Sequence, residues 1–435
     1  MFNLLLLFLI IFPIAVNPFL PEQSYTTHKT IFLVLIISLW WTGVWFKRKN
    51  LLLQWDQVPR LPLFMALLFL SLIIISVLFS VDIQTSLSGK IARYEGLSTW
   101  ICYLSLFVAV LWRSSVFMKY NWLVGFSFIA TLASIQGILE HFNLSIINTG
   151  STRSVSFFSS ANFFGTFSLI AILVTMLLLF TANKKKFAAL YLFLLAIQFL
   201  GLLYSTTRSA WLGLAMCLFI TGVYILWKNR PLFKRYISVI FLFIILFCTA
   251  NNLANNILAN RAATIVQDTK TAITEDNMNA GSHRWYIWRT SLPLIKEYFW
   301  TGSGPDTFHL VFPNDSAETM KYFPTVTVDK AHNEWLQIAV TMGGPALISY
   351  LLLVGTILFK AYKTIIKSKN PSIELVMVTV LISSYLIQAQ FNISVVPVAP
   401  YFWVFLALTY MYALRDEKEF KINSNMSINK NSSTF

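Results

Sequence analysis

Apolar residues in this chain occur in long blocks that short polar segments separate. A block of roughly 17–25 apolar residues is long enough to cross ~30 Å of hydrocarbon as a helix. About twelve blocks qualify, and none has Lys, Arg or Asp in its middle. The pattern predicts an all-α polytopic membrane protein with about twelve transmembrane helices. The predicted spans are 3–20, 30–46, 61–80, 97–112, 121–139, 161–181, 187–205, 209–226, 236–250, 333–359, 374–392 and 398–414.

Composition agrees with this class, and the distribution of charge predicts an orientation. Charged residues make up 12% of the chain, against about 25% in soluble domains. If the N-terminus is cytoplasmic, the inside loops hold 21 of the 33 Lys and Arg residues but only five of the 18 acids. Basic loops stay on the cytoplasmic side, so we expect both termini there. The net charge of +15 therefore orients the chain in a lipid bilayer and does not indicate a nucleic-acid partner. The inside loops are 47–60, 113–120, 182–186, 227–235, 360–373 and the tail after Leu414.

One connection is much longer than the others and divides the chain. Residues 251–332 form an outside loop between the ninth and tenth spans, and loops of this length are usually functional. The two halves of the loop, NNLANNILANRAATIVQDTKTAI and HRWYIWRTSLPLIKEYFW, carry apolar residues at helical spacing. We therefore expect transmembrane helices 1–9 in residues 1–250, amphipathic loop helices in 251–332 and transmembrane helices 10–12 in 333–414. A disordered cytoplasmic tail would follow in 415–435.

Arg208 is the most informative cation on the outside. It lies in STTRSAW, a hairpin of a few residues between the seventh and eighth spans. The planar guanidinium matches phosphate oxygens, and an unpaired guanidinium inside a bundle needs an anion. The pattern favours a diphosphate ligand; the alternative is a side chain that reaches the lipid headgroups.

Four further arginines are candidates on the same side. Arg284 begins the second loop helix, where backbone N–H groups and a cation together favour an anion. Arg289 lies five residues later, about 140° around the helix, so we expect Arg284 rather than Arg289 to face the ligand. Arg93 could bind the same anion or pair with Glu95 or with headgroups. Arg153, in a Ser- and Asn-rich segment, is a weaker candidate.

His332 is the candidate for proton transfer. It lies in DKAHNEWLQIAVTMG, where an outside loop becomes a helix that Asn333 can cap. The partial positive charge of that helix start disfavours the protonated imidazole. A neutral imidazole can accept a proton from a hydroxyl, as a general base does. The alternative is an interfacial histidine bonded to a backbone carbonyl. The outside loops have no HExxH or DxD pattern, so we expect no metal.

These segments resemble the bacterial O-antigen ligase and O-antigen polymerase superfamily. The resemblance rests on SVSFFSSANFFG, STTRSAWLGL, SHRWYIWRTSLPLIKEYFWTGSGPDTF and AHNEWLQIAVTMGG, from about residue 150 to 347. The family has an arginine–serine pair in a hairpin, an arginine at the start of a loop helix, and a His-Asn followed by a glycine. The positions that match are Arg208, Ser209, Arg284, His332, Asn333 and Gly343. Ala346 departs from the family, which usually has Gly, Thr or Tyr there.

The resemblance implies a glycosyltransferase of GT-C-like architecture. Its donor would be a glycan on undecaprenyl diphosphate at the outer face of a bacterial plasma membrane. Arg208, Arg284 and Arg93 would bind the diphosphate, with Arg289, Arg153 and Asn333 as possible additions. His332 would activate an acceptor hydroxyl for inverting attack, without metal or cofactor.

Two questions stay open at this stage. A ligase passes the glycan to a lipid, glycan or protein acceptor, whereas a polymerase passes it to another lipid-linked repeat, and the sequence does not separate them. A transporter or flippase of lipid-linked saccharides also fits twelve spans. Transporters usually place ionisable residues inside the membrane and often show internal repeats, and neither feature is evident here.

Overall fold

The computed structural model is all-helical and describes residues 1–48, 58–145, 147, 153–274 and 278–432. No strand occurs within these ranges, and most of the predicted inside loop 47–60 lies outside them. The helices of the first half are α1 (Phe2–Ile11), α2 (Tyr25–Phe46), α4 (Arg60–Leu78), α5 (Ile83–Ser88), α6 (Leu97–Trp112), α7 (Ser114–Phe117), α8 (Tyr120–His141), α9 (Ala161–Thr181), α10 (Lys185–Ser205) and α11 (Arg208–Lys228). Those of the second half are α12 (Phe233–Leu253), α13 (Ile257–Thr274), α14 (Arg284–Glu297), α15 (Phe308–Val311), α16 (Ala317–Tyr322), α17 (Glu334–Thr341), α18 (Gly344–Lys367), α19 (Ile373–Ala389) and α20 (Ala399–Ser432).

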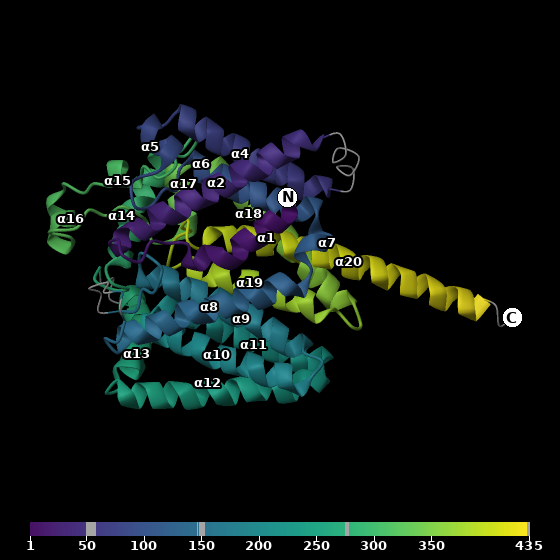
Figure 1. Ribbon diagram of the computed structural model, residues 1–435. Coiled ribbons are helices and arrows are strands. Elements are labelled where there is room, and N and C mark those ends of the chain that lie inside the picture. The colour runs from purple at the N-terminus through teal and green to yellow at the C-terminus, as the bar shows by residue number, and fades with distance from the viewer. Residues whose placement is uncertain (49–57, 146, 148–152, 275–277, 433–435) are drawn as a thin grey trace.

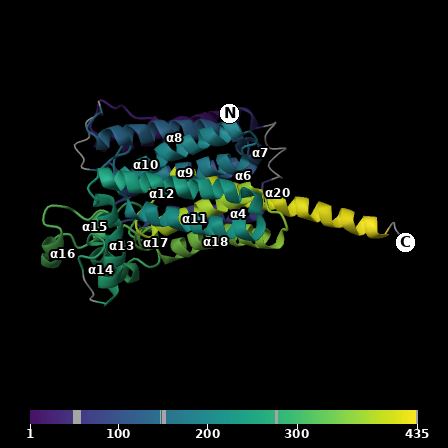
Figure 2. The same ribbon diagram turned by 90° about the horizontal axis from the view of Figure 1, so that it is seen from below.

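The long helices run side by side as one bundle (Figures 1 and 2). By length and composition, eight helices in the described part of the chain can cross a membrane. Three more apolar helices are shorter, at Phe2–Ile14, Leu97–Trp112 and Ile373–Ala389. The protein is thus a multi-pass membrane protein, as predicted. Every predicted apolar block overlaps at least one helix, while the count of twelve spans remains a prediction.

Burial separates the centre of the bundle from its rim. The apolar stretch of α9 is entirely buried, whereas that of α12, at the edge of the bundle in Figure 1, is 17% buried. Side chains such as Phe241 and Ile244 on α12 are 64% and 56% exposed. Exposed apolar surface of this extent is unfavourable in water and favourable against lipid tails. The rim of the bundle therefore suits a bilayer.

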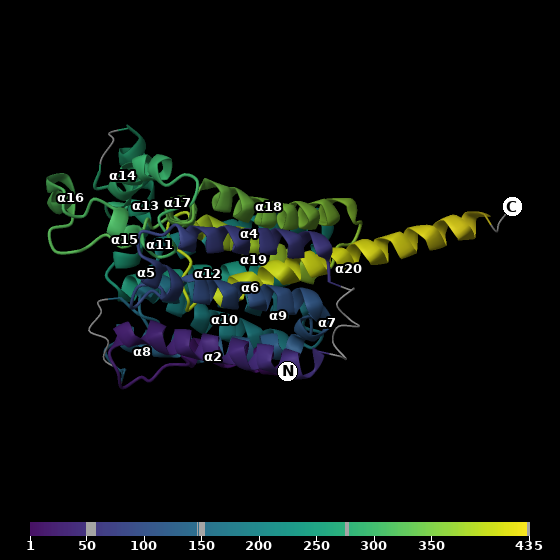
Figure 3. The ribbon, with the colours of Figure 1, turned by 90° about the horizontal axis from the view of Figure 1, so that it is seen from above.

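Helices α13 to α17 gather at one end of the bundle, which we call the loop end, while the last part of α20 projects from the other end (Figures 1 and 3). The polar tail that we predicted to be disordered instead continues α20 as helix to Ser432. No Gly or Pro follows Pro400, so nothing in the backbone interrupts the helix. Glu417 also ties it to the bundle through Lys360 on α18, at 2.6 Å.

The predicted tenth span is divided into two helices, α17 and α18. The backbone N–H groups of Ser303 and Gly304 donate to the carbonyl oxygens of Val340 and Thr341 at 3.0 and 2.8 Å. These bonds satisfy the last turn of α17 and stop its continuation. Gly343 follows with φ of 90°, a conformation that L residues with a side chain rarely adopt. The turn at residues 302–304 of the large loop is thereby bonded to the end of α17, where the bundle helix α18 follows.

Candidate active site

Four arginines converge at the loop end from separate parts of the chain. Arg208 is the first residue of α11 and Arg284 is the first residue of α14. Arg261 lies on α13, and Arg153 lies in the segment that precedes α9. The short hairpin before Arg208 is possible because Thr206 ends α10 with left-handed backbone geometry. Four cations from four elements thus meet where three helices begin or end.

The four guanidinium groups differ in their partners. Arg153 donates to the carbonyl oxygen of Ser205 from Nε at 3.0 Å and from Nη2 at 2.8 Å. Arg208 forms an ion pair with Asp268 on α13, with Nη1 and Oδ2 2.5 Å apart. No hydrogen bond or ion pair of the Arg284 guanidinium occurs among the described residues. A half-buried guanidinium without a partner makes this region receptive to an anion.

Repulsion within the cluster is visible in the pKa values. Burial, then Arg208 and Arg261, lower the pKa of Arg284 to about 10, with Asp268 acting in the opposite direction. Burial, then Arg261, Arg284 and Arg208, lower the pKa of Arg153 to about 10. Both groups therefore remain charged at neutral pH. Among the described residues, one carboxylate offsets part of the positive charge of the cluster, and the excess that remains there is one that an anion would neutralise.

A cavity of about 260 Å³ opens between α11, α13 and α14. Two of the four arginines line it, and the rest of its wall is mostly apolar. We find no group of three or more His, Cys, Asp or Glu side chains suited to a metal in the described ranges. The lining includes Arg208, Leu212, Ile265, Asp268, Arg284, Trp285, Trp288 and Phe391.

His332 lies in the segment that leads into α17. It does not line the cavity, but the carbonyl oxygen of the preceding residue, Ala331, accepts a hydrogen bond from Trp288 of the lining. Burial, followed by Arg284, lowers its pKa to about 4; Asp329 opposes this shift, and Arg93 and Lys330 add to it. The imidazole is therefore neutral at pH 7. The sequence predicted the same direction from the helix start, but burial is the main cause. Nδ1 of His332 is buried without a hydrogen-bond partner.

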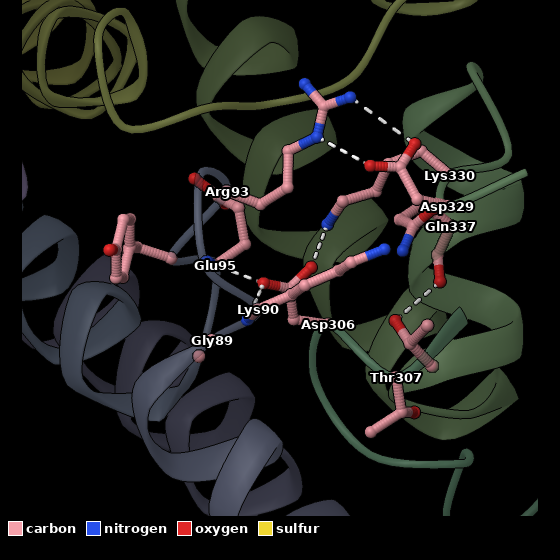
Figure 4. A network of polar contacts seen from close by, with 12 residues as sticks. Gly89, Lys90, Arg93, Glu95, Asp306, Thr307, Asp329, Lys330 and Gln337 are labelled. Carbon is pink, nitrogen blue, oxygen red and sulfur yellow. Dashed lines mark hydrogen bonds and ion pairs between the residues drawn. The ribbon is translucent and has the colours of Figure 1, made fainter. Parts of the chain in front are cut away.

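Two ion pairs fix the residues just before His332 (Figure 4). Arg93 binds Asp329 through Nε at 2.8 Å and Nη2 at 3.3 Å. Lys330 forms an ion pair with Asp306, and their side chains are 2% and 0% exposed. Oδ2 of Asp306 also accepts two backbone N–H groups of the segment 90–95, at 2.7 and 3.1 Å. The large loop, the approach to His332 and the connection before α6 are thereby held together.

The immediate neighbours of His332 are fixed as well. The N–H of Ala331 donates to Oε1 of Gln337 at 2.9 Å, and its carbonyl accepts from Nε1 of Trp288 at 3.0 Å. Asn333 caps α17, as predicted, because its Oδ1 accepts a first-turn N–H at 3.0 Å. Every backbone neighbour is thus held in place, while no hydrogen bond of the His332 imidazole is seen in the described part of the chain. Such an arrangement leaves the ring available to a ligand.

The predicted arginines differ in whether they belong to the cluster or line the cavity. Arg153, the weaker candidate, belongs to the cluster through its electrostatic coupling to Arg284 and Arg208. Arg93 does not line the cavity, and its guanidinium is bound to Asp329 rather than to Glu95. Arg289 is exposed and is not among the residues that line the cavity.

Sequence analysis missed four residues that shape this region. Arg261 lay unremarked in the first amphipathic loop helix, and Asp306 lay in a turn that we interpreted only as a turn. Lys330 is two residues from His332, yet its partner is 24 positions away along the chain. Trp288 was noted only as part of an apolar face. Contacts between distant segments leave no periodic signal, so spacing alone could not identify these roles.

Comparison with known families supports the resemblance. Residues 192–351 match the family described as O-antigen ligase, a range that contains Arg208, Arg261, Arg284 and His332. No curated protein matches the chain. Residues 192–351 are therefore similar to the O-antigen ligase family, which supports the resemblance to the O-antigen ligase and polymerase superfamily.

Proposed function

We propose that the protein transfers a glycan from undecaprenyl diphosphate to an acceptor hydroxyl, by a metal-independent, inverting reaction of the O-antigen ligase type. The observation that carries the proposal is the cluster of Arg153, Arg208, Arg261 and Arg284, two of which line a cavity. Arg284 of this cluster also acts electrostatically on the buried His332. The cluster supplies the excess positive charge that a diphosphate needs. His332 supplies a neutral base within reach of that charge.

The arginines bind the donor and stabilise the leaving group. As the acceptor oxygen bonds to the anomeric carbon, the bond from that carbon to the diphosphate oxygen breaks, and negative charge accumulates on the diphosphate. Guanidinium groups that are already oriented stabilise this charge without reorganisation. Arg284, which has no partner in the described structure, and Arg208 line the cavity and are the main contacts. Arg153 and Arg261 add to the field.

His332 accepts the proton of the acceptor hydroxyl. Burial and Arg284 keep its pKa at about 4, so the ring is unprotonated at pH 7. Proton transfer to a positioned side chain contributes typically 10²–10⁴-fold to a rate, roughly. The segment 329–333, fixed on both sides of the ring, holds the base in place. Attack from the face opposite the diphosphate gives inversion.

The same proposal includes an orientation and an architecture. Twelve spans of GT-C-like arrangement, with helices 1–9 in residues 1–250 and helices 10–12 in 333–414, place the loop 251–332 outside a bacterial plasma membrane. The basic loops then face the cytoplasm. Phe2 packs on Trp112, with ring centroids 5.9 Å apart, at the end of α6, and α20 projects away from the loop end (Figure 1). Both observations support cytoplasmic termini.

The acceptor distinguishes two versions of this function. The ligase version passes the glycan to a lipid, a glycan or a protein, and the family description favours it. The polymerase version extends another lipid-linked repeat. A flippase of lipid-linked saccharides would use the same arginines to bind the donor but would have no need of a base.

A reconstituted assay tests the proposal. The purified protein in lipid receives an undecaprenyl-diphosphate-linked glycan and candidate acceptors, and mass spectrometry resolves the products. Transfer to an acceptor without a lipid diphosphate identifies a ligase, and ladders of longer lipid-linked glycan identify a polymerase. Movement of the donor across the bilayer without any new glycosidic bond would contradict the proposal in favour of a flippase.

A further inference from the structure

The cavity has an aromatic wall next to its two arginines. Trp285 and Trp288 on α14 and Phe391 after α19 line it together with Arg284. The rings of Trp288 and Phe391 lie 6.0 Å apart between centroids, with 42° between their planes. Trp285 and Trp288 lie 6.4 Å apart and nearly edge to face. The wall is thus a packed group of rings rather than a single exposed side chain.

Trp288 connects the charged part of the cavity to the base. It follows Arg284 by four residues, which places both side chains on the same face of α14. Its Nε1 donates to the carbonyl oxygen of Ala331 at 3.0 Å, and this bond holds the ring beside the residue that precedes His332. Trp288 thus contacts both the cavity that holds Arg284 and the residue before His332, so a ligand that reaches from Arg284 towards His332 meets its ring.

The group between a diphosphate and the attacked carbon is a sugar ring. One face of a pyranose presents C–H groups, which pack against aromatic rings, while its hydroxyls point outward from the edge. Trp and Tyr are suited to such surfaces because they combine a large apolar area with a polar atom. The cavity volume of about 260 Å³ is slightly below the roughly 300–1,000 Å³ of sites for drug-sized ligands. A cavity of this size can hold one sugar ring.

We propose that Trp288, supported by Phe391 and Trp285, is the stacking platform for the first sugar of the donor, the one bound directly to the diphosphate. This inference rests on the proposed function. The site then selects the first sugar and leaves the rest of the glycan outside the cavity. An isoprenoid chain is the other apolar group that such a wall could bind, and the experiment below separates the two.

The test compares two ligands that differ only in the sugar. Binding of undecaprenyl diphosphate and of undecaprenyl diphosphate linked to one sugar is measured on the protein in nanodiscs. W288A weakens binding of the sugar-linked ligand by about tenfold, a typical loss for one well-packed aromatic contact. It changes binding of the unsubstituted diphosphate by less than about twofold.

Two further variants separate the ring from its other contacts. W288F keeps an aromatic face but loses the bond to Ala331, so it retains most of the discrimination between the two ligands. W300A is the matched control, because Trp300 is 77% exposed and does not line the cavity; it binds both ligands as the unsubstituted protein does.

Three outcomes overturn the inference. Equal weakening of both ligands by W288A assigns the wall to the isoprenoid chain, and unchanged binding of both leaves it without a ligand. Loss of discrimination in W288F assigns the effect to the bond with Ala331. The proposed function has a separate readout in the same assay: it fails if R208A and R284A bind both ligands normally, whatever Trp288 does.

Discussion

Two groups of charged residues at the loop end differ in how their charges are compensated. In the network of Figure 4, two cations each pair with a carboxylate, Arg93 with Asp329 and Lys330 with Asp306. In the arginine cluster, Asp268 pairs with Arg208 and offsets part of the charge of Arg261 and Arg284. Burial and the neighbouring arginines lower the pKa of Arg153, Arg261 and Arg284. Charges that are compensated by partners within the protein hold the structure together. Positive charges that are compensated only in part can bind an anionic ligand. In the proposed function, the first group therefore supports His332, and the second binds the donor.

The base itself should give the largest effect. H332A removes the proton acceptor while the bonds of its neighbours stay in place, so we expect transfer to fall by roughly 10²–10⁴-fold with normal insertion and donor binding. The measurement is transfer rate and donor binding on the same preparation. H141A is the control, because His141 stacks on Tyr204 at 3.9 Å, away from the cavity lining. Normal transfer by a well-expressed H332A protein excludes His332 as the base.

Breaking the complete network should destabilise the protein. D306N keeps the shape and the left-handed backbone of Asp306, which has φ of 63°, but leaves the buried ammonium of Lys330 uncompensated. Breaking a buried ion pair in this way costs about 3–5 kcal/mol of unfolding free energy. Thermal unfolding in detergent should show a clearly lower midpoint.

The double variant D306N/K330M tests the cause of that loss. Removing both charges leaves no uncompensated ion, so we expect most of the thermal stability to return. If the double variant unfolds as early as D306N, the pair acts through shape and not through charge, and the contrast with the arginine cluster disappears.

Breaking the incomplete cluster should have the opposite effect on stability. R284Q removes a charge that its neighbours repel, so the unfolding midpoint should stay the same or rise. Donor use should still fall, by about 10–100-fold, because a charge-assisted contact is worth about 1.5–3 kcal/mol. R284K should rescue poorly, because the planar fork is lost. R289Q on the same helix is the matched control. Full rescue by lysine would show that Arg284 contributes only its positive charge and not the geometry of its guanidinium.

The contrast between the two groups also marks what could be predicted from the sequence. Blocks of apolar residues predicted the helices, and the family pattern led to Arg208, Arg284 and His332, since each signal lies within one short segment. The break before Gly343 was not predicted, because it depends on N–H groups some 40 residues earlier. The sequence also did not predict that Arg153 would join the arginine cluster while Arg93 would pair with Asp329. The surroundings of these two arginines depend on which charged residue the fold brings near: Asp329 for Arg93 and Arg261 for Arg153. Both charged residues are distant in sequence from the arginines that they affect.

The pH dependence of transfer can sharpen the comparison further. A base must be unprotonated, and the pKa of His332 is about 4, so transfer should persist from neutral pH down to about pH 5 and fall as the pH approaches 4. An ordinary histidine would lose activity below about 6.5. Arg284 is the second cause of this low pKa, so R284Q should move the acidic limb to higher pH. If the acidic side of the pH–rate profile is unchanged in R284Q, the arginine cluster does not set the pKa of His332.

Removal of divalent metal should have the smallest effect of all. In the proposed reaction, the arginine cluster stabilises the charge that develops on the diphosphate, a role that metal ions play in many phosphoryl and glycosyl transfers. Transfer measured with EDTA should therefore equal transfer measured without it. The comparison becomes more informative in R284Q, where the cluster is weakened. If Mg²⁺ or Mn²⁺ restores transfer in R284Q and EDTA leaves the unsubstituted protein unaffected, the missing contribution is positive charge at the diphosphate. If EDTA abolishes transfer in the unsubstituted protein and either metal restores it, the arginines alone do not stabilise the leaving group. In that case the excess positive charge of the arginine cluster, which distinguishes it from the ion-paired network, does not by itself account for catalysis.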